Sequence, residues 1–247
     1  MDSLTLIIVV GAAAAGFVQG LSGFVFAMCA MAFWAWTLDP QLAAVVVVGC
    51  SAVGQVITIL AARRGFNLKR TLPFVAGGVL GVPVGVAVLP LIDQLAFRAA
   101  VGGFLAIYCP AMLLLGGRVR IAKEHAAANS GVGFVGGILG GLGGFTGAVP
   151  TLWASLQAWT KDEQRAIIQW FNLSMHLVTI SGYGISGTFT YERAKWLAVA
   201  VPAMLIPSLV GAKLYAGISD LAFRRLILMI LALAGAALLI SSVPKLF

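Results

Sequence analysis

Two matched groups of polar residues stand within otherwise apolar stretches of the chain. They share internal spacings of four and three residues and lie 121 positions apart: Ser51, Gln55 and Thr58, then Asn172, His176 and Thr179. Spacings of four and three place each trio on one face of a helix. Polar side chains at membrane depth usually face the interior of a helix bundle or a cavity. Each face could therefore hydrogen-bond a neighbouring helix or contact a polar solute.

These polar residues divide into two interpretations. We interpret Thr58 and Thr179 as residues that hydrogen-bond between helices, and Gln55, Asn172 and His176 as residues that line a cavity. An unperturbed imidazole titrates near neutral pH. His176 could thus carry a coupled proton, or it could be a neutral donor to a substrate, and the sequence leaves both roles open.

Two glycine-rich segments could form a binding site of another kind. Residues 16–24 read GFVQGLSGF and residues 136–150 read GGILGGLGGFTGAVP. Glycines four apart allow close helix packing. Each glycine also costs a helix about 1 kcal/mol relative to alanine, so the density of the second segment favours an interrupted helix. Broken helices at corresponding positions of two halves mark the substrate site of many transporters.

Exposed backbone N–H groups at such breaks attract anions. Together with the polar faces, the two glycine-rich segments give nine candidate substrate-binding residues: Gln19, Ser22, Gly23, Gln55, Gly143, Gly144, Thr146, Asn172 and His176.

Signals for an enzyme, a cofactor or a metal site are missing from the sequence. It contains neither an H-E-x-x-H nor a G-x-x-x-x-G-K-[ST] motif. Cys29, Cys50 and Cys109 are far apart within apolar stretches, which favours buried small residues over a metal site or disulfide. The apolar stretches hold no carboxylate, which argues against a carboxylate relay for protons or sodium. We expect no enzymatic activity, no cofactor and no metal.

The elements that must position these residues follow from composition. The chain is 61% hydrophobic and 10% charged, whereas soluble domains carry about 25% charged residues. The charges cluster between apolar stretches, each long enough to cross a bilayer as a helix. The sequence therefore predicts an all-α, polytopic membrane bundle of about eight spans: 3–38, 41–62, 71–92, 97–117, 130–160, 166–189, 195–217 and 221–244.

The eight spans fall into two similar halves. The sequence Leu-Ala-Phe-Arg at 95–98 recurs at 221–224, and other matches follow in the same order with slightly drifting offsets. Internal duplication is a hallmark of secondary transporters. We divide the chain into a four-span repeat at 1–117, a polar linker at 118–129 and a second repeat at 130–247. The span that opens each repeat exceeds 30 residues, enough for a broken or re-entrant helix.

The positive charges bear on orientation and partners. The net charge of +8 belongs to short loops and does not suggest nucleic acid. If each span crosses once, ten Lys and Arg residues lie on the side of both termini and five on the other, which predicts cytoplasmic termini. If the long spans turn back, the crossing number changes and the repeats are inverted rather than parallel.

The glycine-rich segments, the polar turn at 160–166 and the two four-span halves together resemble the sulfite exporter TauE/SafE family of small duplicated permeases. The resemblance covers nearly the whole chain. It implies an anion permease that exports sulfite or organosulfonates, with its site where the two glycine-rich segments meet. The first segment departs from the glycine-dense form at Gln19, Ser22 and Phe26, so the two halves need not bind substrate alike.

The sequence thus predicts a secondary transporter of a small anion, most specifically sulfite or an organosulfonate, in a bacterial-type inner membrane. Its expected partners are that anion and the lipid bilayer, and a homodimer is compatible with the sequence. Two alternatives remain at this point. One is a passive anion channel, and the other is a membrane scaffold subunit without transport.

Overall fold

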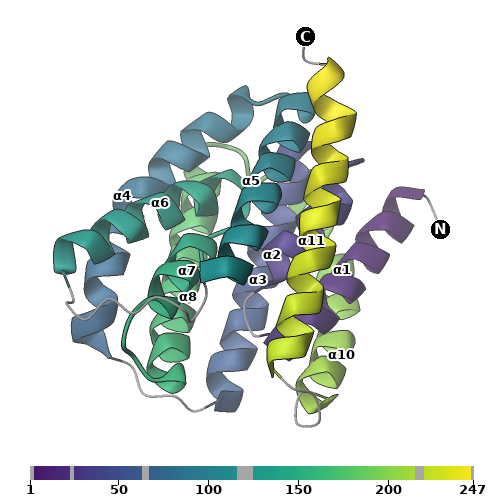
Figure 1. Cartoon of the computed structure of the whole chain (residues 1–247). Helices are drawn as coiled ribbons and strands as arrows, with labels where there is room; N and C mark the ends of the chain where they lie inside the picture. The colour runs from purple at the N-terminus through teal and green to yellow at the C-terminus, as the bar shows by residue number, and fades with distance from the viewer. Residues whose placement is uncertain (1–2, 23–24, 63–66, 116–124, 215–219, 246–247) are drawn as a thin grey trace.

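The computed structural model describes residues 3–22, 25–62, 67–115, 125–214 and 220–245, and this part of the chain is built from helices (Figure 1). No β-strand occurs within these ranges. The long helices, in chain order, are α1 (Ser3–Ser22), α3 (Pro40–Ala62), α4 (Leu68–Val88), α5 (Gln94–Leu115), α6 (Ala126–Gly143), α8 (Lys161–Ile185), α10 (Leu197–Leu214) and α11 (Asp220–Ser242). Shorter helical segments are α2 (Phe26–Trp34), α7 (Ala148–Ser155), α9 (Tyr191–Ala194), and the 3-10 turns η1 (Leu89–Leu91) and η3 (Val243–Lys245).

Seven of the described helices are long and apolar enough to cross a membrane, one fewer than the eight spans expected. The difference falls on α8, which has 25 residues and at 1.5 Å per residue is about 37 Å long. This helix is long enough but more polar than the others. Several of its polar side chains are buried, namely Gln169, Asn172, His176 and Thr179, which is where polar groups of a membrane helix are expected.

The span that opens each half is a broken helix, as the glycine content predicted. In the second half α6 ends at Gly143 and is capped by Gly144, whose φ of 78° lies in the left-handed region that favours glycine. The short helix α7 then runs back along α6, and Trp153 donates a hydrogen bond of 2.8 Å to Oδ1 of Asn129. In the first half α2 runs back along α1, and Trp34 donates 3.2 Å to the carbonyl of Ile7. Both broken segments are therefore re-entrant hairpins.

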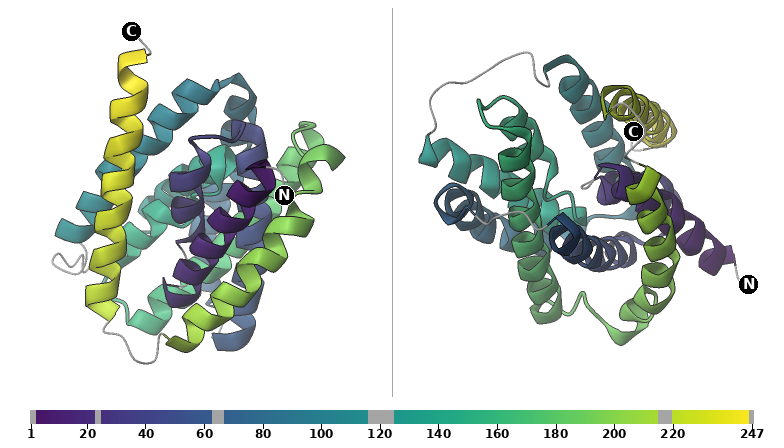
Figure 2. Two further views of the ribbon diagram at one scale, coloured as in Figure 1. Left: turned by 90° about the vertical axis from the view of Figure 1, so that its right-hand side faces the viewer. Right: turned by 90° about the horizontal axis from the view of Figure 1, so that it is seen from below.

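The helices of the two halves pack against one another in pairs. The most extensive contacts join α4 to α6, α1 to α10 and α5 to α11, and α3 lies against α8. Figure 2 shows α1 beside α10 in both of its views. Glycines allow the closest approach, because a Cβ at Gly81 or Gly85 of α4 would overlap backbone atoms of α6, and one at Gly137 would overlap α4. No half could bury these faces alone.

Helix directions follow from the residues in contact. Along α4, residues 77, 81 and 85 meet α6 at about 130–134, 134–138 and 138–142, so these two helices are parallel. Gly16 meets Met204 and Gly211 meets residues 17–21, so α1 and α10 are also parallel. Gly102 meets Leu238 and Gly235 meets Leu105, so α5 and α11 are antiparallel. Tracing these pairs through the hairpins α4–α5 and α10–α11 shows that α1 and α6 run in opposite directions.

We name the two ends of the bundle after residues described below. At the Arg193 face lie the starts of α1, α3 and α10 and the end of α11; at the Arg70 face lie the starts of α4, α6, α8 and α11. The start of α1 and the end of α11 therefore lie toward the Arg193 face.

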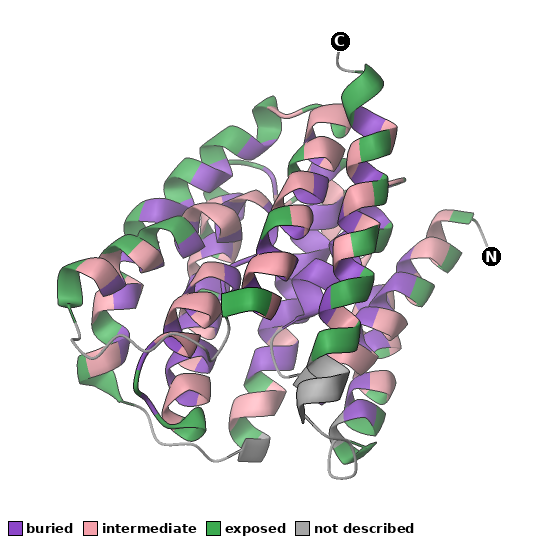
Figure 3. Cartoon of the chain, in the orientation of Figure 1, coloured by how far each residue is buried: buried purple, intermediate pink, exposed green. Residues whose placement is uncertain are grey.

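Buried residues concentrate on α2 and α3 at the centre of the bundle, while the outer faces of α4, α5 and α11 are exposed (Figure 3). The exposed side chains there are largely apolar, including Leu80, Ile107 and Leu233. An apolar outer surface is what a bilayer requires. The protein is a multi-pass membrane protein, and α3 at its centre also carries the buried polar residues Ser51 and Gln55.

Candidate functional site

A small cavity lies midway between the two faces, where the two re-entrant hairpins meet α3 and α8. Its volume is about 10 Å³, about the space of one water molecule. The lining residues come from all four elements: Gln19, Phe26, Ala27, Met28, Ser51, Gln55, Gly144, Phe145, Thr146, Gly147, Ala148, Asn172 and His176.

The N-termini of two short helices point at this cavity. Phe26, Ala27 and Met28 are the first three residues of α2, and Ala148 is the first residue of α7. The N–H groups in the first turn of a helix have no acceptor within that helix. No side chain among the described residues caps either terminus. Two partial positive charges thus converge on the cavity.

Polar side chains from both halves complete the lining. Gln19, Gln55 and His176 are each 2% exposed. Their atoms Oε1, Oε1 and Nδ1, with Oγ of Ser51, have no hydrogen-bond partner among the described residues. Buried polar groups are normally hydrogen-bonded, and an unpaired one costs about 1–3 kcal/mol. Four such groups around one cavity indicate a site that a polar ligand would complete.

One pair in the cavity wall is already satisfied. Thr146 donates a hydrogen bond of 3.0 Å to Oδ1 of Asn172. A Cβ at Gly147 would lie 2.6 Å and 2.7 Å from the two amide atoms of Asn172, so only glycine lets the start of α7 approach this side chain. On the other side, a Cβ at Gly54 would overlap the amide of Gln19. Glycines therefore hold one amide from each half in place.

The structure brings six of the nine predicted site residues to this cavity: Gln19, Gln55, Gly144, Thr146, Asn172 and His176. Gly143 does not line it, because this residue packs against Phe145 and Met31. Ser22 ends α1, and its side chain lies outside the described part of the structure, as does Gly23.

The prediction left out Ser51 and the first residues of α2 and α7. Ser51 matches Asn172 at the same offset of 121 that relates Gln55 to His176, so the repeat itself could have identified it. Phe26, Ala27 and Met28 carry no polar signal and enter the site through their backbone.

The threonines of the two polar faces behave differently from the site residues. Thr58 donates a hydrogen bond of 2.7 Å to the carbonyl of Gly54 in its own helix, so the expected bond to a neighbouring helix was wrong for this residue. Thr179 is fully buried outside the cavity. Within the described ranges, no group of three His, Cys, Asp or Glu residues could hold a metal ion.

A bundle of membrane-spanning helices, re-entrant hairpins that meet at mid-depth, and a polar cavity between them define a membrane transporter. The chain belongs to the sulfite exporter TauE/SafE family, whose sequence profile matches residues 7–238. It is accordingly a membrane transporter of the sulfite and sulfonate type and not an enzyme. No curated protein and no solved structure matches the chain significantly.

Proposed function

We propose that the cavity is the substrate site of an exporter for a small anion, either sulfite or an organosulfonate. The observation that carries the proposal is the convergence of two uncapped helix N-termini on one cavity lined by the buried polar side chains of both halves. Oxygens of an oxyanion would accept hydrogen bonds from the helix N-termini. The side chains of Gln19, Gln55, Asn172 and His176 would supply further donors.

The lining of the cavity favours a singly charged anion. The described lining residues include no Lys, Arg, Asp or Glu. Two helix dipoles contribute roughly half a positive charge each, which matches one negative charge better than two. Burying an uncompensated charge is strongly unfavourable. We expect a sulfonate or hydrogen sulfite to compete for the site better than sulfate.

A carrier accounts for the geometry better than a passive channel. The cavity holds about one water molecule, so an oxyanion with four or more heavy atoms needs helices to move before it can enter. A channel would conduct through a continuous opening. A scaffold subunit would not need a polar cavity at the centre of the bundle, so it explains the structure less well than a transporter does.

Flux of labelled sulfonates and sulfite in proteoliposomes tests this function. We expect saturable flux, inhibited by unlabelled sulfonate more strongly than by sulfate at equal concentration. If collapsing the proton gradient lowers the flux of the parent protein but not that of a His176→Gln variant, the coupled proton is assigned to His176. Movement of a cation or neutral solute without any anion flux would contradict the proposal.

We also propose an orientation opposite to the one expected from single crossings. With re-entrant hairpins, twelve of the sixteen Lys and Arg residues belong to segments that begin or end at the Arg70 face, and four belong to the other: Arg98, Arg193, Lys195 and Lys245. Positive charge accumulates on the cytoplasmic side. The Arg70 face would then be cytoplasmic and the Arg193 face, with both chain ends, external.

Thiol labelling checks this orientation. In a background with the three native cysteines replaced by alanine, Lys245→Cys should react with a membrane-impermeant maleimide in intact cells. Lys161→Cys, at the Arg70 face, should react only after the cells are opened. The reverse pattern would restore cytoplasmic termini.

A further inference from the structure

Two ion pairs lie at opposite faces of the bundle, and each joins one half to the other. At one face Nη1 of Arg70 lies 2.6 Å from Oε1 of Glu163. At the other, Nη2 of Arg193 lies 4.0 Å from Oδ2 of Asp39. Arg70 and Asp39 belong to the first half of the sequence, and Glu163 and Arg193 belong to the second.

The two arginines have the same place in their helices. Arg70 is the third residue of α4, and its N–H is capped by Oδ1 of Asn67 at 3.2 Å. Arg193 is the third residue of α9, and its N–H is capped by Oγ1 of Thr190 at 3.3 Å. Asn67 and Thr190 are 123 positions apart in the sequence, and so are Arg70 and Arg193.

The two acids lie at the starts of matching helices, three residues apart at the offset of 121 that relates α3 to α8. Asp39 precedes α3 and accepts a hydrogen bond of 3.0 Å from the N–H of Leu42. Glu163 is the third residue of α8 and forms a capping box with Thr160, whose N–H donates 2.9 Å to Oε2 of Glu163. Each acid therefore sits in the N-terminal cap of the helix that carries its half's polar cavity residues.

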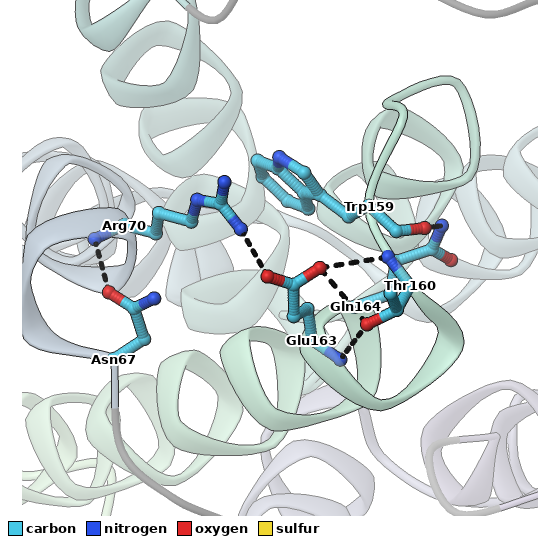
Figure 4. Close-up of polar contacts among 6 residues, drawn as sticks. All are labelled: Asn67, Arg70, Trp159, Thr160, Glu163 and Gln164. Atoms are coloured by element: carbon cyan, nitrogen blue, oxygen red, sulfur yellow. Dashed lines mark hydrogen bonds and ion pairs between the residues drawn. The ribbon is translucent and has the colours of Figure 1, made fainter.

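The Arg70–Glu163 pair, drawn in Figure 4, has the shorter distance between its charged atoms of the two ion pairs. The Arg70 guanidinium also lies over the ring of Trp159, 5.5 Å from its centroid. Behind it, Trp159, Phe74 and Phe171 form a chain of edge-to-face rings with centroids 6.4 Å and 6.2 Å apart. Phe171 adjoins Asn172 of the cavity in the sequence of α8. This chain of buried rings extends from Arg70 into the interior of the bundle.

We propose that these ion pairs are the two gates of the transporter, one at each face, and that the structure shows the Arg70 gate closed. This inference rests on the proposed function, since a gate needs a transported substrate. In an inverted repeat, one movement that separates α4 from α8 is related by symmetry to one that separates α9 and α10 from α3. Partly exposed ion pairs suit this role because they are weak enough to open repeatedly.

Accessibility of a cavity residue tests the gates without relying on transport. The reporter is Ser51→Cys in the background without native cysteines. A membrane-impermeant maleimide added to right-side-out vesicles reaches it from one face, and the same reagent added to inverted vesicles reaches it from the other. Arg70→Glu places an acid beside Glu163, so the two side chains repel each other. The labelling rate from the Arg70 face should then rise about two- to fivefold, which is the change in equilibrium that loss of a partly exposed ion pair can produce. Arg193→Glu should do the same from the Arg193 face. The exchange Arg70→Glu with Glu163→Arg should return labelling to the parent rate.

A neighbouring pair provides the matched control. Lys195 and Glu192 form an ion pair near Arg193 but belong to the same half, three residues apart. Lys195→Glu, which changes the charge by the same amount as Arg193→Glu, should leave labelling from both faces unchanged. A rise in labelling equal to that of Arg193→Glu would overturn the proposal, because it would show a general effect of surface charge.

Cross-linking gives a second measurement. A short reducible linker between Arg70→Cys and Glu163→Cys should stop anion flux, and reductant should restore it; a linker between Asp39→Cys and Arg193→Cys should do the same. Unchanged flux in a fully linked protein would overturn the gates while leaving the transport function intact. A parent protein that moves no anion would instead contradict the proposed function, and the labelling pattern would then show only whether the ion pairs close access to the cavity.

Discussion

Replacing Gln55 with methionine should weaken anion transport roughly 10- to 100-fold without lowering the stability of the protein. Gln55 is buried beside the cavity, where its amide Nε2 would donate to an anion, and its Oε1 has no partner among the described residues. Methionine keeps the length of the side chain and removes its polar atoms. A hydrogen bond to a charged ligand contributes about 1.5–3 kcal/mol, which corresponds to this loss of affinity. The free protein loses no hydrogen bond that the structure shows, so its melting temperature should stay level or rise.

Transport in proteoliposomes and thermal unfolding in detergent measure the two effects separately. Thr58→Val, on the next turn of α3, is the control, because the Thr58 hydroxyl bonds its own backbone outside the cavity. This variant should keep normal flux. If Gln55→Met lowered the melting temperature and flux together, Gln55 would be a packing residue and the substrate site would lie elsewhere.

The polar part of the site could be predicted from the sequence because helical spacing and duplication are both local patterns. Gln55 pairs with His176, and Ser51 with Asn172, by a constant offset. All four line the cavity. What the pattern could not supply is the contribution of backbone groups. The first residues of α2 and α7 have apolar side chains and reach the site because their helices begin there.

The breaks in the opening helices were predictable from glycine, but the direction of the chain after each break was not. A broken helix can continue across the membrane or turn back, and both satisfy the backbone equally well. Contacts distant in sequence decide between them here, such as the hydrogen bonds from Trp34 to Ile7 and from Trp153 to Asn129. Because each hairpin adds no net crossing, the positive charges redistribute between the faces. The prediction of cytoplasmic termini depended on single crossings that the structure does not have.

Helix α8 shows a similar limit. Its apolar stretch was predicted as a span, yet its polarity keeps it outside the seven helices that are apolar enough to cross by composition. A helix surrounded by other helices can carry polar residues that lipid would not accept. Hydropathy identifies the buried helix α3 as a span but not α8, whose polar residues Asn172 and His176 line the cavity.

A single methyl group added at Gly137 should destabilise the protein by about 3 kcal/mol, the upper part of the range for overpacking. A Cβ at this position would overlap the carbonyl oxygen of Gly78 in α4. Backbone atoms cannot rotate out of the way as a side chain can, so the two helices must separate. These helices come from different halves and form the most extensive contact in the bundle.

Alanine at Gly131 is the control, because a Cβ there meets nothing within 4 Å. Alanine favours a helix by up to about 1 kcal/mol over glycine, so Gly131→Ala should raise the unfolding midpoint in a denaturing detergent while Gly137→Ala lowers it. Opposite signs for one substitution in one helix would separate packing from helix propensity. A rise for both would mean that α4 and α6 are not in close contact, and the pairing of the two halves would then have to be different.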